Sequence, residues 1–304
     1  MKDQFNPTAN NTAENNRYDP VSLMFKERVI MVAGEVNTQM AYNVIAQLKK
    51  LELLDQDAPI KMLINSPGGS VIDGMAILDV MRQVKCKIET IGNGMQASMG
   101  SILLAGGDTR SMTKNSMLLV HQIMGGAKGG TQHSDFEISG AFMAQLHEKL
   151  KSVYVEFTGL NHKFWDIVGE RDSWLTAEQA FRIGYISGVV EPGKEGGRYA
   201  ADAVRADKEG LQAALDKTTK AYIAQMSADE IARAINSGNA AGGVYSRIRG
   251  ELIVKLASFP EFWTETKKKE MALQSAVPAV ANDDHKAPQA RTKRKAAGSD
   301  PSGL

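Results

Sequence analysis

Short apolar runs that alternate with helical patterns are the feature that most limits the fold of this chain. Four such runs, each with a glycine-containing turn at its end, are "RVIMVAG" (28–34), "PIKMLINSPGG" (59–69), "KIETIGNG" (87–94) and "SMLLVHQIMGG" (116–126). Strands that alternate with helix-length segments favour crossover units, in which consecutive strands lie parallel. The sequence therefore predicts an α/β fold with a mostly parallel sheet over residues 24–192.

The segments between these runs have the apolar spacing of helices. Asn37 or Thr38 can cap the first helix. The segment that begins at Ser98 is the third helix, and residues 135–159 form a long fourth one. The apolar faces of the first two helices are formed by Ala41, Val44, Ile45 and Leu48, and by Met75, Leu78, Val80 and Met81.

Composition excludes several classes of protein. The net charge of +1 provides no general attraction to nucleic acid, which we do not expect as a partner. The single cysteine, Cys86, excludes an internal disulfide framework and suits a reducing compartment. No apolar run is long enough to cross a membrane, and the polar start of the chain does not resemble a signal peptide. We expect the protein in the cytoplasm.

The texture of the chain changes twice. Residues 1–20 are polar and rich in asparagine, which predicts a flexible N-terminal arm before a domain at 21–192. Residues 193–281 form a linker and a helical extension of unknown role, with helix-like patches at 211–226, 229–235 and 245–256. Residues 282–304 are polar and basic, as in a disordered tail.

Five residues could together perform acyl transfer by a serine. This chemistry needs a nucleophile, a base, an orienting carboxylate and amide donors for an oxyanion. Ser98 and His121 follow strands, and the carboxyl ends of parallel strands line a ligand crevice. Asp172 precedes a helical pattern and could orient His121, while the amides of Gly69 and Met99 are candidate donors.

Each of these residues also has a structural explanation. Ser98 could be a small residue that opens a buried helix, because Gln96 stands where the G-x-S-x-G motif needs its first glycine. His121 could be a structural histidine, and Asp172 could cap the helix near Thr176 or pair with Arg171. The sequence contains neither a zinc-binding H-E-x-x-H motif nor a phosphate-binding P-loop, and we expect no metal. The histidines that compete with His121 on composition are His133, His147 and His162.

Five blocks of sequence resemble, in order and spacing, the proteolytic subunit of Clp proteases from Tyr18 to Glu191. The resemblance implies a crotonase-like α/β fold and an ATP-dependent serine endopeptidase. In that case Ser98 is the nucleophile, His121 the base and Asp172 the orienting acid, and Gly69 and Met99 form the oxyanion hole. The blocks are "LMFKERVIMVAGEVN", "INSPGGSVIDGMAILDVM", "GMQASMGSILLAGG", "VHQIMGGAKGGT" and "ERDSWLTAEQAFRIGYI".

The same resemblance implies an assembly and a partner. Residues 122–150 match the glycine-rich strand and the long "handle" helix that join two stacked heptameric rings. An unfolded polypeptide would pair with the strand over 125–130, at Gly125, Gly126 and Gly129, through its backbone. A Clp-family unfoldase would deliver this substrate and consume the ATP, so that the chain itself needs no cofactor.

Two of the departures from the Clp pattern concern the partner and the length of the chain. Lys61, Leu63 and Gln83 stand where the family docks its unfoldase on aromatic residues, which indicates an atypical unfoldase or none. Residues 193–304 lie beyond the usual end of the family. Three alternatives therefore stay open: a phage-type Clp-like head-maturation protease, a non-catalytic regulatory ring subunit, and an acyl-CoA enzyme of the crotonase type.

Overall fold

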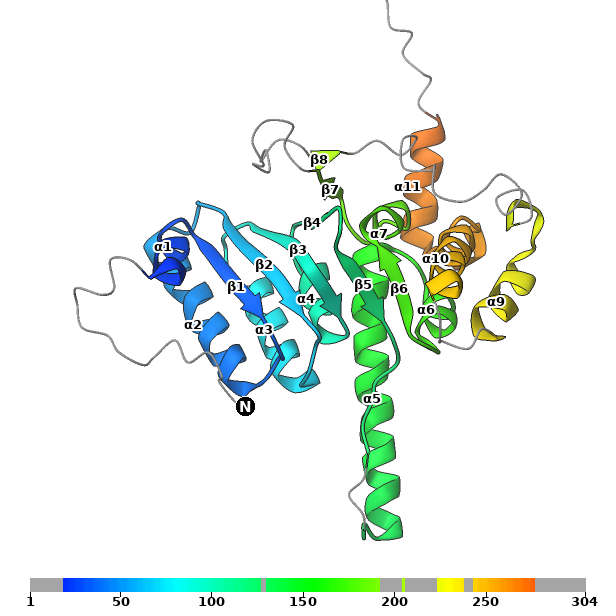
Figure 1. The fold of residues 1–304 in the computed structure, drawn as a ribbon, viewed down its shortest axis with the longest axis horizontal. Coiled ribbons are helices and arrows are strands. Elements are labelled where there is room, and N and C mark those ends of the chain that lie inside the picture. The colour runs from blue at the N-terminus through cyan, green and yellow to red at the C-terminus, as the bar shows by residue number, and fades with distance from the viewer. Residues whose placement is uncertain (1–18, 127–129, 192–203, 206–222, 238–242, 277–304) are drawn as a thin grey trace, which may run out of the picture.

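A mostly parallel β-sheet forms the centre of the molecule, as predicted (Figure 1). The computed structural model describes residues 19–126, 130–191, 204–205, 223–237 and 243–276. Six strands lie in the order β1-β2-β3-β4-β7-β8, while β5 pairs with β3 and β6 pairs with β5. The strands are β1 (Val29–Ala33), β2 (Ile60–Ser66), β3 (Ile88–Ala97), β4 (Thr109–Thr113), β5 (Met117–Val120), β6 (Ser173–Thr176), β7 (Gly188–Val190) and β8 (Val204–Arg205).

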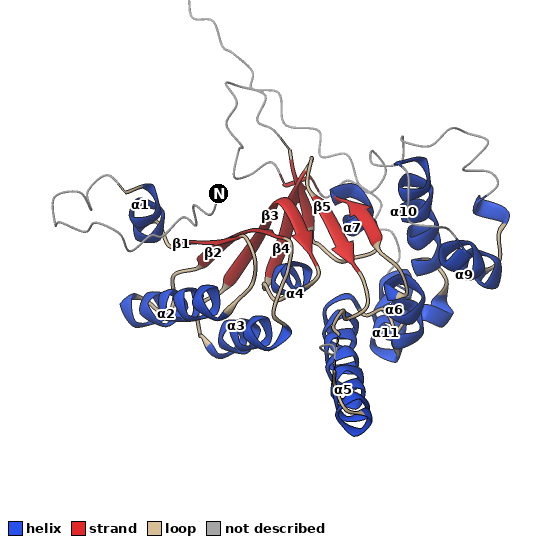
Figure 2. Ribbon diagram, turned by 60° about the horizontal axis from the view of Figure 1, so that its bottom comes forward, coloured by secondary structure: helices blue, strands red, loops and turns tan. Residues whose placement is uncertain are grey.

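Crossover helices cover one face of this sheet, where Figure 2 shows α2 (Thr38–Leu54), α3 (Val71–Gln83) and α4 (Met99–Ala105) together. A shorter helix, α1 (Pro20–Lys26), precedes β1. Asn37 is the cap of α2, since its side chain accepts the Met40 N–H at 2.9 Å. The expected buried face of α2 is confirmed at Ala41, Val44 and Leu48, with Ile45 partly buried.

Strand β3 is shared between two branches of the sheet. Its first half pairs in parallel with β4, from Glu89 to Gly92, and its last residues, Met95–Ala97, pair in parallel with β5. The carboxyl ends of β3 and β5 consequently lie side by side. This places the residues that follow them, Ser98 and His121, at the same edge of the sheet.

The structure corrects the expected elements at several points. The run at 116–126 forms a strand only over Met117–Val120, and residues 121–126 have no regular structure, because no described strand pairs with them. The strand expected at 125–130 is therefore absent from its described part. Asp172 lies before β6 rather than directly before a helix, and Thr176, not Asp172, caps α7 (Ala177–Arg182). Strands β4, β6, β7 and β8 were not predicted.

The long helix α5 (His133–Thr158) projects beyond the sheet (Figure 1). Its buried residues are Lys151, Val153, Tyr154 and Thr158, which all lie in its C-terminal part. The helix matches the expected one at 135–159. It is followed by the short helix α6 (His162–Gly169).

The C-terminal extension shares its core with the rest of the molecule. It contains α9 (Ala228–Ser237), α10 (Gly243–Ala257), the 3-10 helix η2 (Pro260–Phe262) and α11 (Glu265–Ala276). Ile231, Ile253 and Phe262 are at most 1% exposed and belong to the same apolar cluster as the strands. The helical patches at 229–235 and 245–256 are confirmed, and α11 was not predicted.

Several expectations concern residues that are not described. These are the arm up to residue 18, the linker over 192–203, most of the patch at 211–226 and the basic tail. In the part of the chain that the structure does describe, no helix is both long and apolar enough to span a bilayer.

Candidate active site

Ser98 occupies a strained backbone position at the turn from β3 into α4. Its φ of 52° and ψ of −120° lie outside the regions favoured by residues other than glycine. Hydrogen bonds hold this geometry: the Ser98 N–H donates to the Leu119 carbonyl at 3.0 Å, and the Ser98 carbonyl accepts from the backbone and hydroxyl of Ser101. Strain maintained in this way is typical of functional positions.

The hydroxyl of Ser98 does not cap the helix that follows it. Ser98 is the N-cap residue of α4, yet its side chain makes no capping hydrogen bond. The residue is partly exposed, whereas every residue of α4 is buried. A serine that served only as a cap would direct its oxygen to the N–H groups of the first turn. Capping of α4 therefore does not explain the serine at this position.

The Gly68–Gly69 turn lies directly against the Ser98–Met99 peptide. A Cβ on Gly68 would lie 2.6 Å from the Ser98 Cβ and 2.9 Å from the Met99 nitrogen. Gly68 and Gly69 both have positive φ, at 93° and 144°. Only glycine fits both the close approach and the backbone conformation. Gly69 was predicted as a donor from the sequence and Gly68 was not, although the double glycine of "SPGGS" is the signal that could have indicated it.

The N–H groups of Gly69 and Met99 both lie near this turn. Val36 bonds to the Gly68 carbonyl and to the Ser70 N–H, both at 2.8 Å, and among the described residues this bridge leaves the Gly69 N–H without an acceptor. Met99 is the first residue of α4, so its N–H has no acceptor within the helix. The contact between Gly68 and the Met99 nitrogen keeps the two peptides close together. Such a pair of donors can stabilise an oxyanion.

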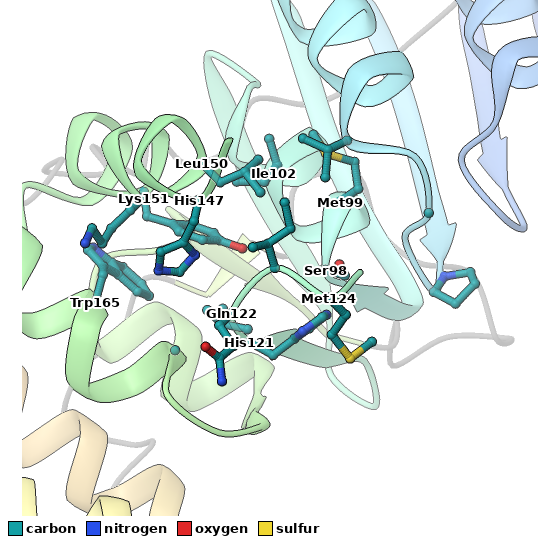
Figure 3. A pocket seen from close by; sticks show the side chains of 17 residues that line it. Ser98, Met99, Ile102, His121, Gln122, Met124, His147, Leu150, Lys151 and Trp165 are labelled. Atoms are coloured by element: carbon teal, nitrogen blue, oxygen red, sulfur yellow. The ribbon is translucent and has the colours of Figure 1, made fainter. Parts of the chain in front are cut away.

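One cavity of about 180 Å³ brings four of the predicted residues together. Ser98, Met99, Gly69 and His121 all line it. Figure 3 shows Ser98 and His121 towards one end, and His147, Lys151 and Trp165 towards the other. The Nδ1 atom of His121 is buried and has no hydrogen-bond partner among the described residues.

Asp172 does not line this cavity. Strands β5 and β6 are antiparallel, and their last pair is Val120 with Ser173. Residues that face each other on antiparallel strands have Cβ atoms about 5 Å apart, so a register continued by one residue would bring Asp172 close to His121. Asp172 is exposed in this single chain, and its charge acts on the Arg249 guanidinium of α10.

The far end of the cavity is aromatic, which the sequence did not indicate. The rings of Tyr154 and Trp165 stack with centroids 4.8 Å apart, and the Tyr154 hydroxyl bonds to Ser101 at 2.9 Å. Burial raises the pKa of Tyr154 to about 12, so this phenol stays neutral near pH 7. The two rings can therefore bound a substrate side chain without exchanging protons with it.

The other predicted histidines and glycines differ in whether they line the cavity. His147 lines the cavity from α5, while His133 is exposed on that helix and faces Glu137 at 3.8 Å. His162 faces Glu148 at 4.0 Å. Gly125 and Gly126 are described but do not line the cavity, and Gly129 lies outside the described residues. The described residues contain no group of three or more histidine, cysteine, aspartate or glutamate side chains able to hold a metal ion.

The family model described as "Clp protease" matches residues 12–193, which is more than half of the chain. The chain belongs to the Clp protease family. It is 39% identical over 175 residues to the ATP-dependent Clp protease proteolytic subunit of Leuconostoc citreum, covering 57% of this chain and 88% of that one. It is 39% identical over 176 residues to the protein of the same name from Streptococcus mutans, covering 57% and 90%.

The matched region ends before the C-terminal extension. The Clp protease match stops at residue 193, so α9, α10 and α11 are additions to the family domain. All the predicted site residues, from Gly69 to Asp172, lie within the matched part. The Clp protease match thus covers strands β1 to β7 and the residues that line the cavity, but not β8 or the helices α9, α10 and α11.

Gly68→Ala should inactivate the site, because the added methyl group would displace Ser98. We expect peptidase turnover to fall by at least about 100-fold, comparable with the loss of one oxyanion donor. Gly34→Ala is the matched control, because Gly34 has a similar φ of 89° but open space around its Cβ position. Peptide hydrolysis and thermal unfolding of both variants check this. Equal losses of turnover would show that backbone strain, not the contact with Ser98, is responsible.

Proposed function

We propose that this chain is a serine-type endopeptidase, the proteolytic subunit of a Clp-type ATP-dependent protease that hydrolyses unfolded polypeptides with Ser98, His121 and Asp172. Membership of the Clp protease family supports a peptidase. The observation that carries the serine mechanism is the strained backbone of Ser98, whose hydroxyl makes no capping hydrogen bond. Ser98 and His121 line the same cavity. A cytoplasmic location fits the single cysteine.

The proposed reaction proceeds in two halves. Ser98 Oγ attacks the scissile carbonyl carbon while His121 takes the hydroxyl proton, and His121 then gives that proton to the leaving amine. The N–H groups of Gly69 and Met99 stabilise the tetrahedral oxyanion. Water, activated by His121, hydrolyses the acyl-enzyme and releases the second product with Ser98 restored.

Asp172 is the proposed partner of the His121 ring. Among the described residues the buried Nδ1 atom of His121 has no hydrogen-bond partner, and an unpaired buried polar group costs about 1–3 kcal/mol. A β5–β6 register continued by one residue would put the Asp172 carboxylate opposite His121, which supports this pairing. A small adjustment at the end of the β5–β6 ladder would let the carboxylate accept the Nδ1 proton, which fixes the tautomer required of a base.

Ser98→Ala and His121→Ala should each reduce hydrolysis of a short fluorogenic peptide by at least about 1,000-fold, because each removes a member of one catalytic unit. His147→Ala is the control, because His147 lines the same cavity but has no role in the mechanism. Short peptides need no unfolding, so the assay isolates the chemistry. Activity retained in Ser98→Ala would reject the proposal, and a silent wild type that still forms rings would favour a regulatory subunit.

The outer half of α5 supports the proposed assembly into two stacked heptameric rings. Phe136, Ile138 and Phe142 are 62%, 68% and 52% exposed on the part of the helix that projects from the sheet. Exposed apolar groups of this kind mark interaction surfaces. We propose that this handle joins the rings, and that Gly125, Gly126 and Gly129 then contact the extended substrate.

Ile138→Glu combined with Phe142→Glu should prevent the rings from stacking, because charged side chains are costly to bury in an apolar interface. Sedimentation velocity should then show particles of half the wild-type mass or less. Ser139→Glu, which adds a charge to the same exposed turn, should leave the mass unchanged. A full-mass particle from the double variant would show that α5 does not join the rings.

The proposed unfoldase surface is more polar than the family pattern. Lys61 and Leu63 are partly exposed on β2, Gln83 is exposed at the end of α3, and the Lys61 ammonium faces Glu89 at 3.8 Å. A polar, ion-paired surface is a poor receptor for an apolar anchor. We therefore propose that any unfoldase of this protease docks through atypical contacts.

A standard Clp unfoldase should stimulate degradation of an unfolded protein by the wild-type chain no more than about twofold. The double change Lys61→Tyr and Gln83→Tyr should increase this stimulation at least about tenfold, because aromatic side chains dominate such contacts. Lys87→Tyr, at an exposed lysine on the same domain, serves as the control. Strong stimulation of the wild type would contradict the proposal.

A further inference from the structure

The extension makes an unusual contact at the segment that carries Asp172. Arg249 of α10 donates from Nε to the Ser173 hydroxyl at 3.1 Å and from Nη2 to the Arg171 carbonyl at 3.4 Å. These two residues flank Asp172 on either side. A third bond, from Nη1 to the Ile235 carbonyl, ties the end of α9 to the same guanidinium. One side chain of the extension thus holds both neighbours of the predicted triad acid.

Ser173 connects this contact to the strand pairing. It is fully buried, its hydroxyl bonds to the Val168 carbonyl at 2.6 Å, and it forms the last pair of β6 with Val120 of β5. Val120 immediately precedes His121. Through Ser173, the guanidinium of Arg249 therefore contacts the last residue pair of the β5–β6 ladder. The position of that pair determines how far His121 lies from Asp172.

The charge of Arg249 is also placed near Asp172. Arg249 is half-buried, and burial lowers the pKa of its guanidinium, while the Asp172 carboxylate acts in the opposite direction. Its fork of donors matches several acceptors at once, which a lysine ammonium cannot do equally well. Arg249 is thus positioned to fix the backbone around Asp172 and to attract its carboxylate.

The next two residues hold α10 against the same part of the fold. A Cβ on Gly250 would lie 2.4 Å from the Gln179 Oε1 atom, so α10 approaches α7 very closely. Glu251 accepts two bonds from Arg182, at 2.9 and 2.8 Å, and one from Gln179 at 3.2 Å. These contacts stabilise the helix without touching residues 171–173.

We propose that Arg249 is a positioning residue for Asp172, and hence that the C-terminal extension is a working part of the catalytic unit. This inference rests on the proposed triad. Arg249 does not line the substrate cavity, so it acts on the rate of the chemical step rather than on substrate binding. A shift of the orienting acid by about 1 Å can lower turnover by about 100-fold.

The test compares three variants of the full chain with short-peptide hydrolysis as the readout. Arg249→Met should lower kcat about 10- to 100-fold with KM within about twofold of the wild type. Arg249→Lys, which retains the charge but not the fork, should recover part of the loss. Glu251→Gln, which breaks the neighbouring ion pair on α10, should keep kcat within about twofold. An unchanged or increased kcat in Arg249→Met, or an equal loss in Glu251→Gln, overturns the proposal.

Hydrogen exchange separates this proposal from the proposed function. Amides at 171–176 should exchange at least about tenfold faster in Arg249→Met than in Glu251→Gln, whether or not the protein hydrolyses peptides. Unchanged exchange would overturn the role of Arg249 even in an active enzyme. The wild type could also fail to cleave peptides and fail to react at Ser98 with a fluorophosphonate. That result would reject the triad, and with it the positioning of a catalytic acid, even if exchange is faster in Arg249→Met.

Discussion

The pairing of β3 with three other strands is the constraint on which the rest of this structure depends. Its hydrogen bonds to β2, β4 and β5 place the carboxyl ends of several strands at one edge of the sheet. Ser98 follows β3 and His121 follows β5, so they meet without any direct bond between their side chains. The β5–β6 pairing ends at Val120 and Ser173, the residues next to His121 and Asp172. Main-chain hydrogen bonds thus place the segments that carry the proposed triad.

Much of this arrangement follows from sequence patterns, because those patterns record burial. The apolar runs predicted β1, β2, β3 and β5, and helical spacing predicted α2, α3 and α5. The strands that were missed have at most five residues. Of these, β4 contains Thr109, Arg110 and Ser111 and shows little apolar alternation. Such strands are specified by the neighbours they pair with, and single-sequence patterns carry no information about pairing.

The sequence predicted those site residues whose type the chemistry requires. It did not predict the residues whose role depends on contacts made in the folded chain. Serine, histidine and aspartate could be named from their reactivity and from the Clp resemblance. The double glycine of "SPGGS" indicated a turn at Gly68, but the distance from that turn to Ser98 could not be predicted, because the two turns are distant in sequence. The contact of Arg249 with residues 171–173 was hidden for the same reason, and because the extension lies outside the family match.

The shared core of the extension has a consequence for the order of events during synthesis. Ile253, Leu256 and Phe262 are among the last described residues to leave the ribosome, yet they complete the packing beside β6. At about 5–20 residues per second, the sheet is made several seconds before these helices exist. Arg249, which lies in α10, is also synthesised after the strands of the sheet. Under the proposed triad, a nascent chain therefore makes Ser98, His121 and Asp172 before it makes the helix that carries Arg249.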